Sequence, residues 1–113
     1  MPYKYRDPSG VLSPKHSVQK VIVIFDGKTN EDHPFSIAKI LWKGKWCIGI
    51  RWNINQNEWG DPNKKSGKNI CIGEPNSRGY PTWFIIPKEF LQLLLSEKSE
   101  LSKILKKAIS EIN

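Results

Sequence analysis

Two short stretches of the sequence each bring an arginine together with amide or hydroxyl side chains. The first is IRWN at residues 50–53 and the second is NSRGY at residues 76–80. A guanidinium group donates two parallel hydrogen bonds to a phosphate or carboxylate, and short polar side chains add further donors. If the fold brings the two stretches together, the sequence predicts a site for an anionic ligand formed by Arg51, Asn53, Asn76, Ser77, Arg78 and Tyr80.

The same side chains also have a purely structural interpretation. Arginine and asparagine at strand ends often donate to backbone carbonyls and so fix long loops, and NSRG at residues 76–79 is a favourable turn sequence. The sequence leaves the ligand site and the loop anchor open as alternatives for Arg51 and Arg78.

The overall charge favours anionic partners. The chain of 113 residues has 18 Lys and Arg against 11 Asp and Glu, a net charge of +7, and such an excess attracts nucleotides and nucleic acid, although surface charge also serves solubility. Most of the excess lies in residues 1–56. Within the later segment KKSGK, we expect Lys64, Lys65 and Lys68 to contact a nucleic-acid backbone.

A catalytic alternative uses the same region. Small metal-free ribonucleases and toxins commonly combine a basic residue, an acid and an arginine, and Glu58, Glu74, Arg51 and Arg78 are of these types. His33 lies in a turn before a proline and is a weak candidate for acid-base work. Nothing in the spacing of these residues requires catalysis, and no phosphate-binding glycine loop or serine elbow is present.

Metal, cofactor and membrane sites are not predicted. Cys47 and Cys71 are 24 residues apart with no Cys-x-x-Cys spacing, which argues against zinc, and no cofactor motif occurs. No stretch approaches the eighteen or so apolar residues that a membrane span needs, and no leader pattern opens the chain. We therefore expect a cytoplasmic protein with reduced thiols and no membrane partner.

The elements that position these residues begin after an extended arm. Residues 1–17 contain three prolines and no periodicity, with one turn expected at Asp7 to Gly10, and residues 18–113 are predicted to form a single α+β domain. Val18 to Phe25, which contains VIVIF, is apolar on both faces. This pattern favours a central strand over an edge strand.

A hairpin is predicted from Phe35 to Asn53, folded about Lys43-Gly44. A two-residue loop places Leu41 opposite Trp46, Ile37 opposite Ile50 and Phe35 opposite Trp52, whereas one added residue would oppose Ile37 to Arg51. The chosen register sends Gly49, Arg51 and Asn53 to the other face. It also predicts Trp46 and Trp52 in the core, which leaves Trp42, Trp59 and Tyr80 as the exposed aromatics.

The second half of the chain starts with a long polar segment. Residues 54–79 hold only the short apolar stretch Ile70 to Ile72, and loops of this length are either functional or disordered. Thr82 to Ile86 predicts a strand, and Pro87 opens a helix. Ser96 or Ser99 then caps a second helix, or one long bent helix continues. Its apolar stripe is Leu101, Ile104, Leu105, Ala108, Ile109 and Ile112.

The predicted fold is therefore α+β: an antiparallel sheet of four or five bent strands, with partial closure into a small barrel as an option, and one or two C-terminal helices. RWN at 51–53 followed by GEPNSRGYPTWFIIP at 73–87 resembles a motif pair in small bacterial proteins of unknown function, often encoded as accessory or mobile-element genes. The resemblance covers roughly the central half of the chain and brings no activity. It implies that the two motifs are neighbours in space.

Three functions are compatible with these features. The leading one is a non-catalytic binding protein for an anionic ligand, either a nucleotide-like molecule at the arginine cluster or a nucleic-acid backbone. The second is a small metal-free ribonuclease or toxin-like protein. The third is a protein-interaction or assembly module that binds a protein partner, or a second copy as a homodimer, through the amphipathic C-terminal helix.

Overall fold

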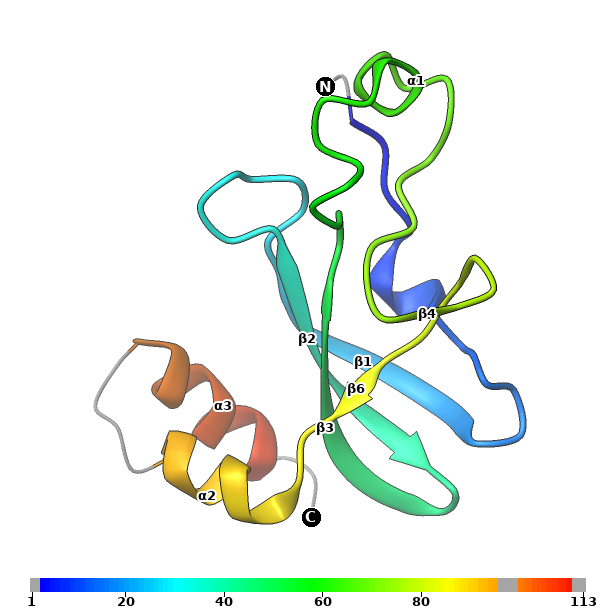
Figure 1. Ribbon diagram of the computed structural model, residues 1–113. Helices are drawn as coiled ribbons and strands as arrows, with labels where there is room; N and C mark the ends of the chain where they lie inside the picture. Colours follow the sequence, from blue (N-terminus) through cyan, green and yellow to red (C-terminus); the bar gives the residue numbers. More distant parts are fainter. Residues whose placement is uncertain (1–2, 96–99, 111–113) are drawn as a thin grey trace.

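The computed structural model of the protein, which describes residues 3–95 and 100–110, confirms the α+β class (Figure 1). A four-stranded antiparallel sheet has the strand order β1-β2-β3-β6, and β4 and β5 pair in a second small sheet. The strands are β1 (Val18–Asp26), β2 (Phe35–Trp42), β3 (Lys45–Trp52), β4 (Asn76–Ser77), β5 (Tyr80–Pro81) and β6 (Phe84–Ile85). The helices are the 3-10 turn η1 (Pro8–Gly10), α1 (Pro62–Lys65), α2 (Lys88–Leu95) and α3 (Glu100–Ser110).

The register of the central hairpin is the predicted one. In β2 and β3, Leu41 lies opposite Trp46, Ile37 opposite Ile50 and Phe35 opposite Trp52. Lys43 and Gly44 form the two-residue loop with φ angles of 50° and 83°. Two consecutive positive φ angles are those of the turn whose twist matches a right-handed strand pair, so the turn and the hydrophobic pattern specify the same register.

The predicted central position of the VIVIF strand was wrong, because β1 is an edge strand of the sheet. Both of its faces are nevertheless covered, since Val18 and Val21 pack into one core cluster while Ile24 and Phe25 pack against the other. Irregularities in the pairing with β2 occur between Val18 and Lys20 and between Val23 and Phe25. An apolar pattern on both faces therefore indicates that both faces of the strand are covered. It does not indicate whether other strands pair with both edges of that strand.

The sheet separates two hydrophobic clusters. Alternate residues of β2 point to opposite faces, so Ala38 and Ile40 join the first cluster and Ile37 joins the second. The first cluster consists of Val11, Val18, Ala38, Ile40 and Trp83, and the second of Ile37, Ile48, Ile86 and Leu105. The N-terminal arm covers the first face, and helices α2 and α3 lie together over the second (Figure 1).

The arm is extended and has its turn where the sequence predicts one. Asp7 caps η1 by accepting a hydrogen bond from the Ser9 backbone N–H at 2.9 Å. Val11 is fully buried, and its carbonyl accepts a hydrogen bond of 2.8 Å from Trp83 Nε1. The arm therefore contributes a core side chain and a buried hydrogen bond to the first face of the sheet.

The predicted burial of Trp46 and Trp52 was wrong. Trp46 is 36% exposed and Trp52 is 52% exposed, because both lie near the ends of β3. Tyr80 is 69% exposed, as predicted, whereas Trp42 and Trp59 are partly buried. Register decides which face a side chain occupies, but the extent of the covering layer decides whether that side chain is buried.

The C-terminal part follows the predicted order with shorter strands. Ile70 to Ile72 forms only an isolated bridge at Cys71, and within residues 82–86 only β6 is a strand. Pro87 precedes α2 as predicted, and its carbonyl accepts a hydrogen bond from the backbone N–H of Leu91 at 3.0 Å. Helices α2 and α3 pack against each other, and residues 96–99, which connect them in the sequence, lie outside the described residues.

The expected capping of the second helix at Ser96 or Ser99, and Ile112 of its stripe, lie outside the described residues. Leu105 of that stripe is buried and Ile104 is partly buried. None of the described helices is long and apolar enough to cross a membrane.

Candidate functional site

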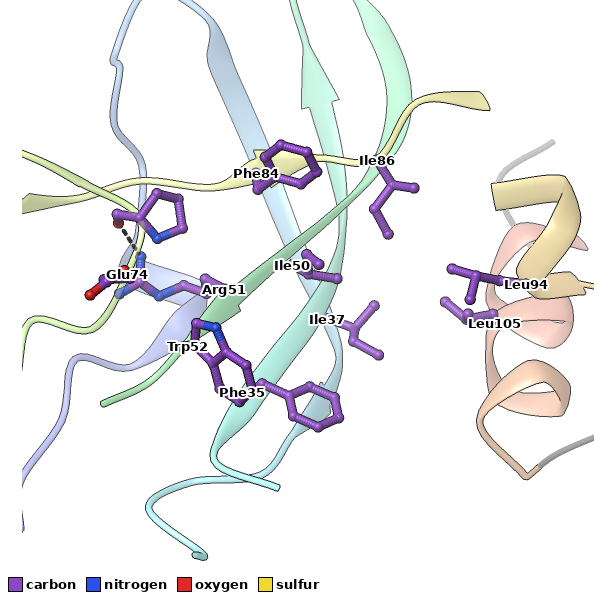
Figure 2. A pocket seen from close by; sticks show the side chains of 11 residues that line it. Phe35, Ile37, Ile50, Arg51, Trp52, Glu74, Phe84, Ile86, Leu94 and Leu105 are labelled. Carbon is purple, nitrogen blue, oxygen red and sulfur yellow. Dashed lines mark hydrogen bonds between the residues drawn. The ribbon is translucent and has the colours of Figure 1, made fainter. Parts of the chain in front are cut away.

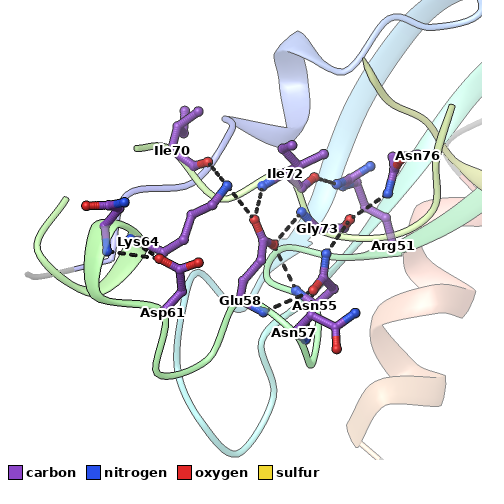
Figure 3. A network of polar contacts seen from close by, with 11 residues as sticks. Arg51, Asn55, Asn57, Glu58, Asp61, Lys64, Ile70, Ile72, Gly73 and Asn76 are labelled. Atoms are coloured by element: carbon purple, nitrogen blue, oxygen red, sulfur yellow. Dashed lines mark hydrogen bonds and ion pairs between the residues drawn. The ribbon is translucent and has the colours of Figure 1, made fainter. Parts of the chain in front are cut away.

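Arg51 acts as a loop anchor. Its side chain is only 3% exposed, and its guanidinium donates to three backbone carbonyls, those of Ile72, Pro75 and Thr82. Burial lowers the pKa of Arg51 to about 10, while the negative charge of Glu58 acts in the opposite direction. These bonds tie the long loop and the segment after it to β3, which is the structural alternative that the sequence left open (Figure 3).

Asn53 is also buried in a structural network. Its Oδ1 accepts a hydrogen bond of 2.7 Å from Ser36 Oγ, and its Nδ2 donates to Asp26 Oδ1 at 3.2 Å and to the Lys28 carbonyl at 2.9 Å. Asp26 Oδ2 in turn accepts from the Tyr5 hydroxyl at 2.7 Å. Burial, followed by this hydrogen bond, raises the pKa of Tyr5. The network joins the arm, β1, β2 and the end of β3.

The other four predicted ligand residues lie on an exposed hairpin. Ser77 pairs with Tyr80, and between them Arg78 and Gly79 have φ angles of 52° and 86°. The Oδ1 of Asn76 accepts a hydrogen bond from the Gly79 backbone N–H at 3.3 Å, which stabilises the turn. Within the described residues, no side-chain hydrogen bond or ion pair of Arg78 is formed.

The six residues therefore do not form one cluster of free donors. Two are buried and bonded to the protein, and four are exposed at the hairpin. The motifs that carry them are nevertheless adjacent, since Trp52 and Glu74 exchange two backbone hydrogen bonds of 2.6 and 3.0 Å.

The long loop is organised around Glu58, whose structural role the sequence analysis did not identify (Figure 3). Its carboxylate accepts hydrogen bonds from the backbone N–H groups of Asn55, Ile72 and Gly73 at 3.1, 2.7 and 2.9 Å, and pairs with Lys64 Nζ at 3.0 Å. Burial alone would raise the pKa of Glu58, but these four interactions outweigh it and lower the pKa. Glu58 therefore joins the start of the long loop, at Asn55 and Lys64, to its end at Ile72 and Gly73.

The lysines of the loop differ from one another. The ammonium group of Lys64 is not available for a ligand, because it pairs with Glu58 and donates to the Ile70 carbonyl at 2.8 Å. Lys65 and Lys68 are exposed. Only the latter two are therefore available for contact with a nucleic-acid backbone without breaking the loop.

A cavity of about 520 Å³, the sheet–helix cavity, lies between the second face of the sheet and the C-terminal helices. Figure 2 shows side chains of β2, β3 and β6 on one side and of α2 and α3 on the other. The lining residues are Phe35, Ile37, Ile50, Arg51, Trp52, Glu74, Pro75, Phe84, Ile86, Leu94 and Leu105. Apart from Arg51 and Glu74 at one end, the wall is apolar, so its shape suits an apolar group.

A second cavity of about 320 Å³, the tryptophan cavity, shares two residues with the first. Trp52 and Glu74 line both. The remaining lining residues are Pro34, Ile54, Asn55, Gln56 and Trp59. Trp52 and Glu74, which pair in an isolated bridge, thus form a wall that the two cavities share.

A third feature is a group of lysines at one end of the sheet, which we call the basic end: Lys15, Lys20, Lys43 and Lys45. The Lys43 backbone N–H donates to the Ser17 carbonyl at 2.8 Å, which joins the hairpin turn to the arm. All four lysines are exposed, and no ion pair within 4.0 Å involves them in the described part of the chain. The signal was visible in the sequence, since residues 8–25 and 33–57 contain no acid.

Residues with catalytic potential are not assembled in the described chain. Arg51 and Glu58 make structural bonds to loop backbone, and Glu74 and Arg78 are exposed without a mutual ion pair. His33 is exposed beside Phe25, with ring centroids 5.8 Å apart. No three His, Cys, Asp or Glu side chains gather to hold a metal ion among these residues.

Comparison with known proteins gives no relative. No protein-family model, no curated protein and no solved structure matches the chain.

Proposed function

We propose that this protein is a non-catalytic binding protein for a polyanion, with the phosphates of a nucleic-acid backbone contacted by the basic end of the sheet. The supporting observation is that Lys15, Lys20, Lys43 and Lys45 gather from the arm and two strands without an acid nearby in sequence. Unpaired ammonium groups attract phosphates and release bound counterions.

An aromatic side chain at the same end supports a single-stranded ligand. Trp46 is 36% exposed and lies opposite Leu41, whose other neighbour across the sheet is Lys20. Bases stack on exposed tryptophan with little sequence preference, while lysines follow the backbone. A cytoplasmic location, where the free thiols of Cys47 and Cys71 stay reduced, belongs to this proposal.

The test is the salt dependence of binding to a single strand and to a duplex. We expect the logarithm of the binding constant to fall linearly with the logarithm of salt concentration, with a slope set by roughly three or four phosphate contacts. The variant Lys15→Gln/Lys43→Gln/Lys45→Gln should lose most of that slope.

A matched control removes the same charge elsewhere. Lys65→Gln/Lys68→Gln/Lys88→Gln changes three exposed lysines, including the two loop lysines that remain available. Equal weakening by both variants would mean that net charge alone attracts the ligand. Weakening by the control only would move the contact to the loop lysines or to Lys88 of α2.

A second candidate function is protein interaction through α2. Phe90, Leu93 and Leu94 are 62%, 65% and 41% exposed, which is a large apolar surface for one short helix. Apolar side chains gathered on a surface commonly mark an interface. If α2 mediates self-association, the mass measured by sedimentation will rise with concentration, and Phe90→Ser/Leu93→Ser will abolish the rise.

A further inference from the structure

The wall that the two cavities share contains an acid, Glu74, whose carboxylate makes no bond to the described part of the protein. The side chain of Glu74 is exposed, and within the described residues its carboxylate forms no hydrogen bond and no ion pair within 4.0 Å. Its backbone is fixed, however, by the two hydrogen bonds to Trp52. A rigid backbone beside two cavities thus presents a free negative charge.

Arg51, the other charged residue that lines the sheet–helix cavity, makes its hydrogen bonds to the protein. Its guanidinium donates to the carbonyls of the long loop and of Pro75 and Thr82, and it interacts electrostatically with Glu58. An anionic ligand would have to compete for these bonds. A cationic ligand needs only Glu74.

The tryptophan cavity offers a second feature suited to a cation. Trp52 and Trp59 both line it, and each is braced by an aromatic neighbour: Phe35 at 6.0 Å for Trp52 and Tyr3 at 5.1 Å for Trp59, both edge to face. Indole is the best side chain for cation–π attraction, and aromatic groups with a carboxylate are the usual surroundings of bound ammonium ions. The amides of Asn55 and Gln56 complete the lining.

We propose that the two cavities together bind an amphipathic ammonium compound. Its cationic head lies in the tryptophan cavity between Trp52, Trp59 and Glu74, and its apolar tail enters the sheet–helix cavity between the sheet and helices α2 and α3. The larger cavity, about 520 Å³, lies within the range of roughly 300 to 1,000 Å³ typical of small-molecule sites. This site is separate from the basic end and does not depend on polyanion binding.

The test compares three probes below the concentration at which they form micelles: octyltrimethylammonium, octyl sulfate and tetramethylammonium. Dissociation constants come from calorimetry, and tryptophan fluorescence reports the site. We expect octyltrimethylammonium to bind at least about 10-fold more tightly than octyl sulfate, and tetramethylammonium to bind far more weakly than either because it lacks the tail. The net charge of +7 favours the sulfate non-specifically, so a preference for the cation must arise locally.

Two matched variants assign the preference to one residue. Glu74→Gln should reduce the preference for the cation to within about 2-fold while leaving a tail-dependent affinity, because an ion pair and not the apolar contact is removed. Glu89→Gln removes an exposed acid of α2 and should change nothing. Circular dichroism and thermal melting establish that both variants fold.

Three outcomes would overturn the proposal. These are equal affinity for the two octyl probes, the same effect of Glu74→Gln and Glu89→Gln, and tetramethylammonium binding as tightly as its octyl derivative.

Discussion

Gly49 and Ile50 are adjacent in β3, yet they meet opposite surroundings. A Cβ atom on Gly49 would lie 2.3 Å from Ile40 Cδ1 and 3.3 Å from two atoms of Trp83, whereas Ile50 lines the sheet–helix cavity. The first face is sealed by the arm and by loops whose carbonyls accept from Arg51. The second face is covered by two helices that leave space beneath them.

The comparison separates stability from binding. The side chains that the sequence assigned to a ligand, Arg51 and Asn53, bond to the protein itself and close the first face, although Arg51 also lines one end of the sheet–helix cavity. The free volume, the exposed Trp52 and the unpaired Glu74 lie on or beside the second face. We therefore expect substitutions on the first face to lower stability and substitutions around the second to change binding.

The largest effect is expected at Arg51. Arg51→Met keeps the apolar stem but removes the guanidinium donor from the carbonyls of Ile72 and Thr82, whereas the Pro75 carbonyl still accepts from the Thr82 backbone N–H at 2.9 Å. Each unsatisfied group costs about 1 to 3 kcal/mol, so we expect a loss of at least about 2 kcal/mol in the free energy of unfolding, measured by urea denaturation. Arg78→Gln, on the exposed hairpin, should change it by no more than about 0.5 kcal/mol. Similar losses in the two variants would remove the distinction between the buried and the exposed arginine.

The next largest change in the free energy of unfolding is expected at Gly49, and it is to be compared with the change at its neighbour Ile50. Gly49→Ala forces a methyl group against Ile40 and Trp83 and should cost about 1 to 3 kcal/mol. Ile50→Phe adds a larger group on the cavity side, and we expect it to cost less than about 1 kcal/mol because space exists there. The same denaturation measurement checks both. A greater loss for Ile50→Phe would show that the second face is packed as tightly as the first.

A pH effect is expected from Glu58. Its pKa is lower in the folded than in the unfolded protein, so its stabilisation is present above the ordinary carboxylate range and is lost as the pH falls through the folded pKa. Glu58→Gln should therefore cost about 1 to 2 kcal/mol at neutral pH, and the difference from wild type should shrink below about pH 4. A difference that stays constant down to pH 2 would mean that the charge of Glu58 does not stabilise the loop.

The smallest effect on stability is expected at Leu94, which lines the cavity and is 41% exposed. Leu94→Ala should lower the free energy of unfolding by less than about 1 kcal/mol, since little apolar area returns to water. The same change should weaken octyltrimethylammonium binding several-fold because the tail loses a contact. Unchanged binding would exclude helix α2 from the site.

The sequence was sufficient for features that depend on neighbours in the chain. The alternation in β3 and the Lys43-Gly44 turn specified the hairpin register, because a one-residue shift would have exchanged its faces. Pro87 located the start of the last helical region, since proline fits the first turn without losing a hydrogen bond. The charge excess was likewise visible in composition alone.

Tertiary structure alone decided how polar and aromatic groups are used. Whether Arg51 binds a ligand or a carbonyl depends on where residues 72–82 lie, and whether Trp52 is buried depends on how far the covering helices extend. Likewise, VIVIF has an apolar pattern on both faces at the edge of the sheet, because covering layers and strand neighbours are independent. The local sequence pattern determines which face of the sheet a side chain occupies. Contacts between residues distant in sequence determine which groups pack against that side chain. Those contacts produce no periodicity in the sequence, so the sequence alone did not predict them.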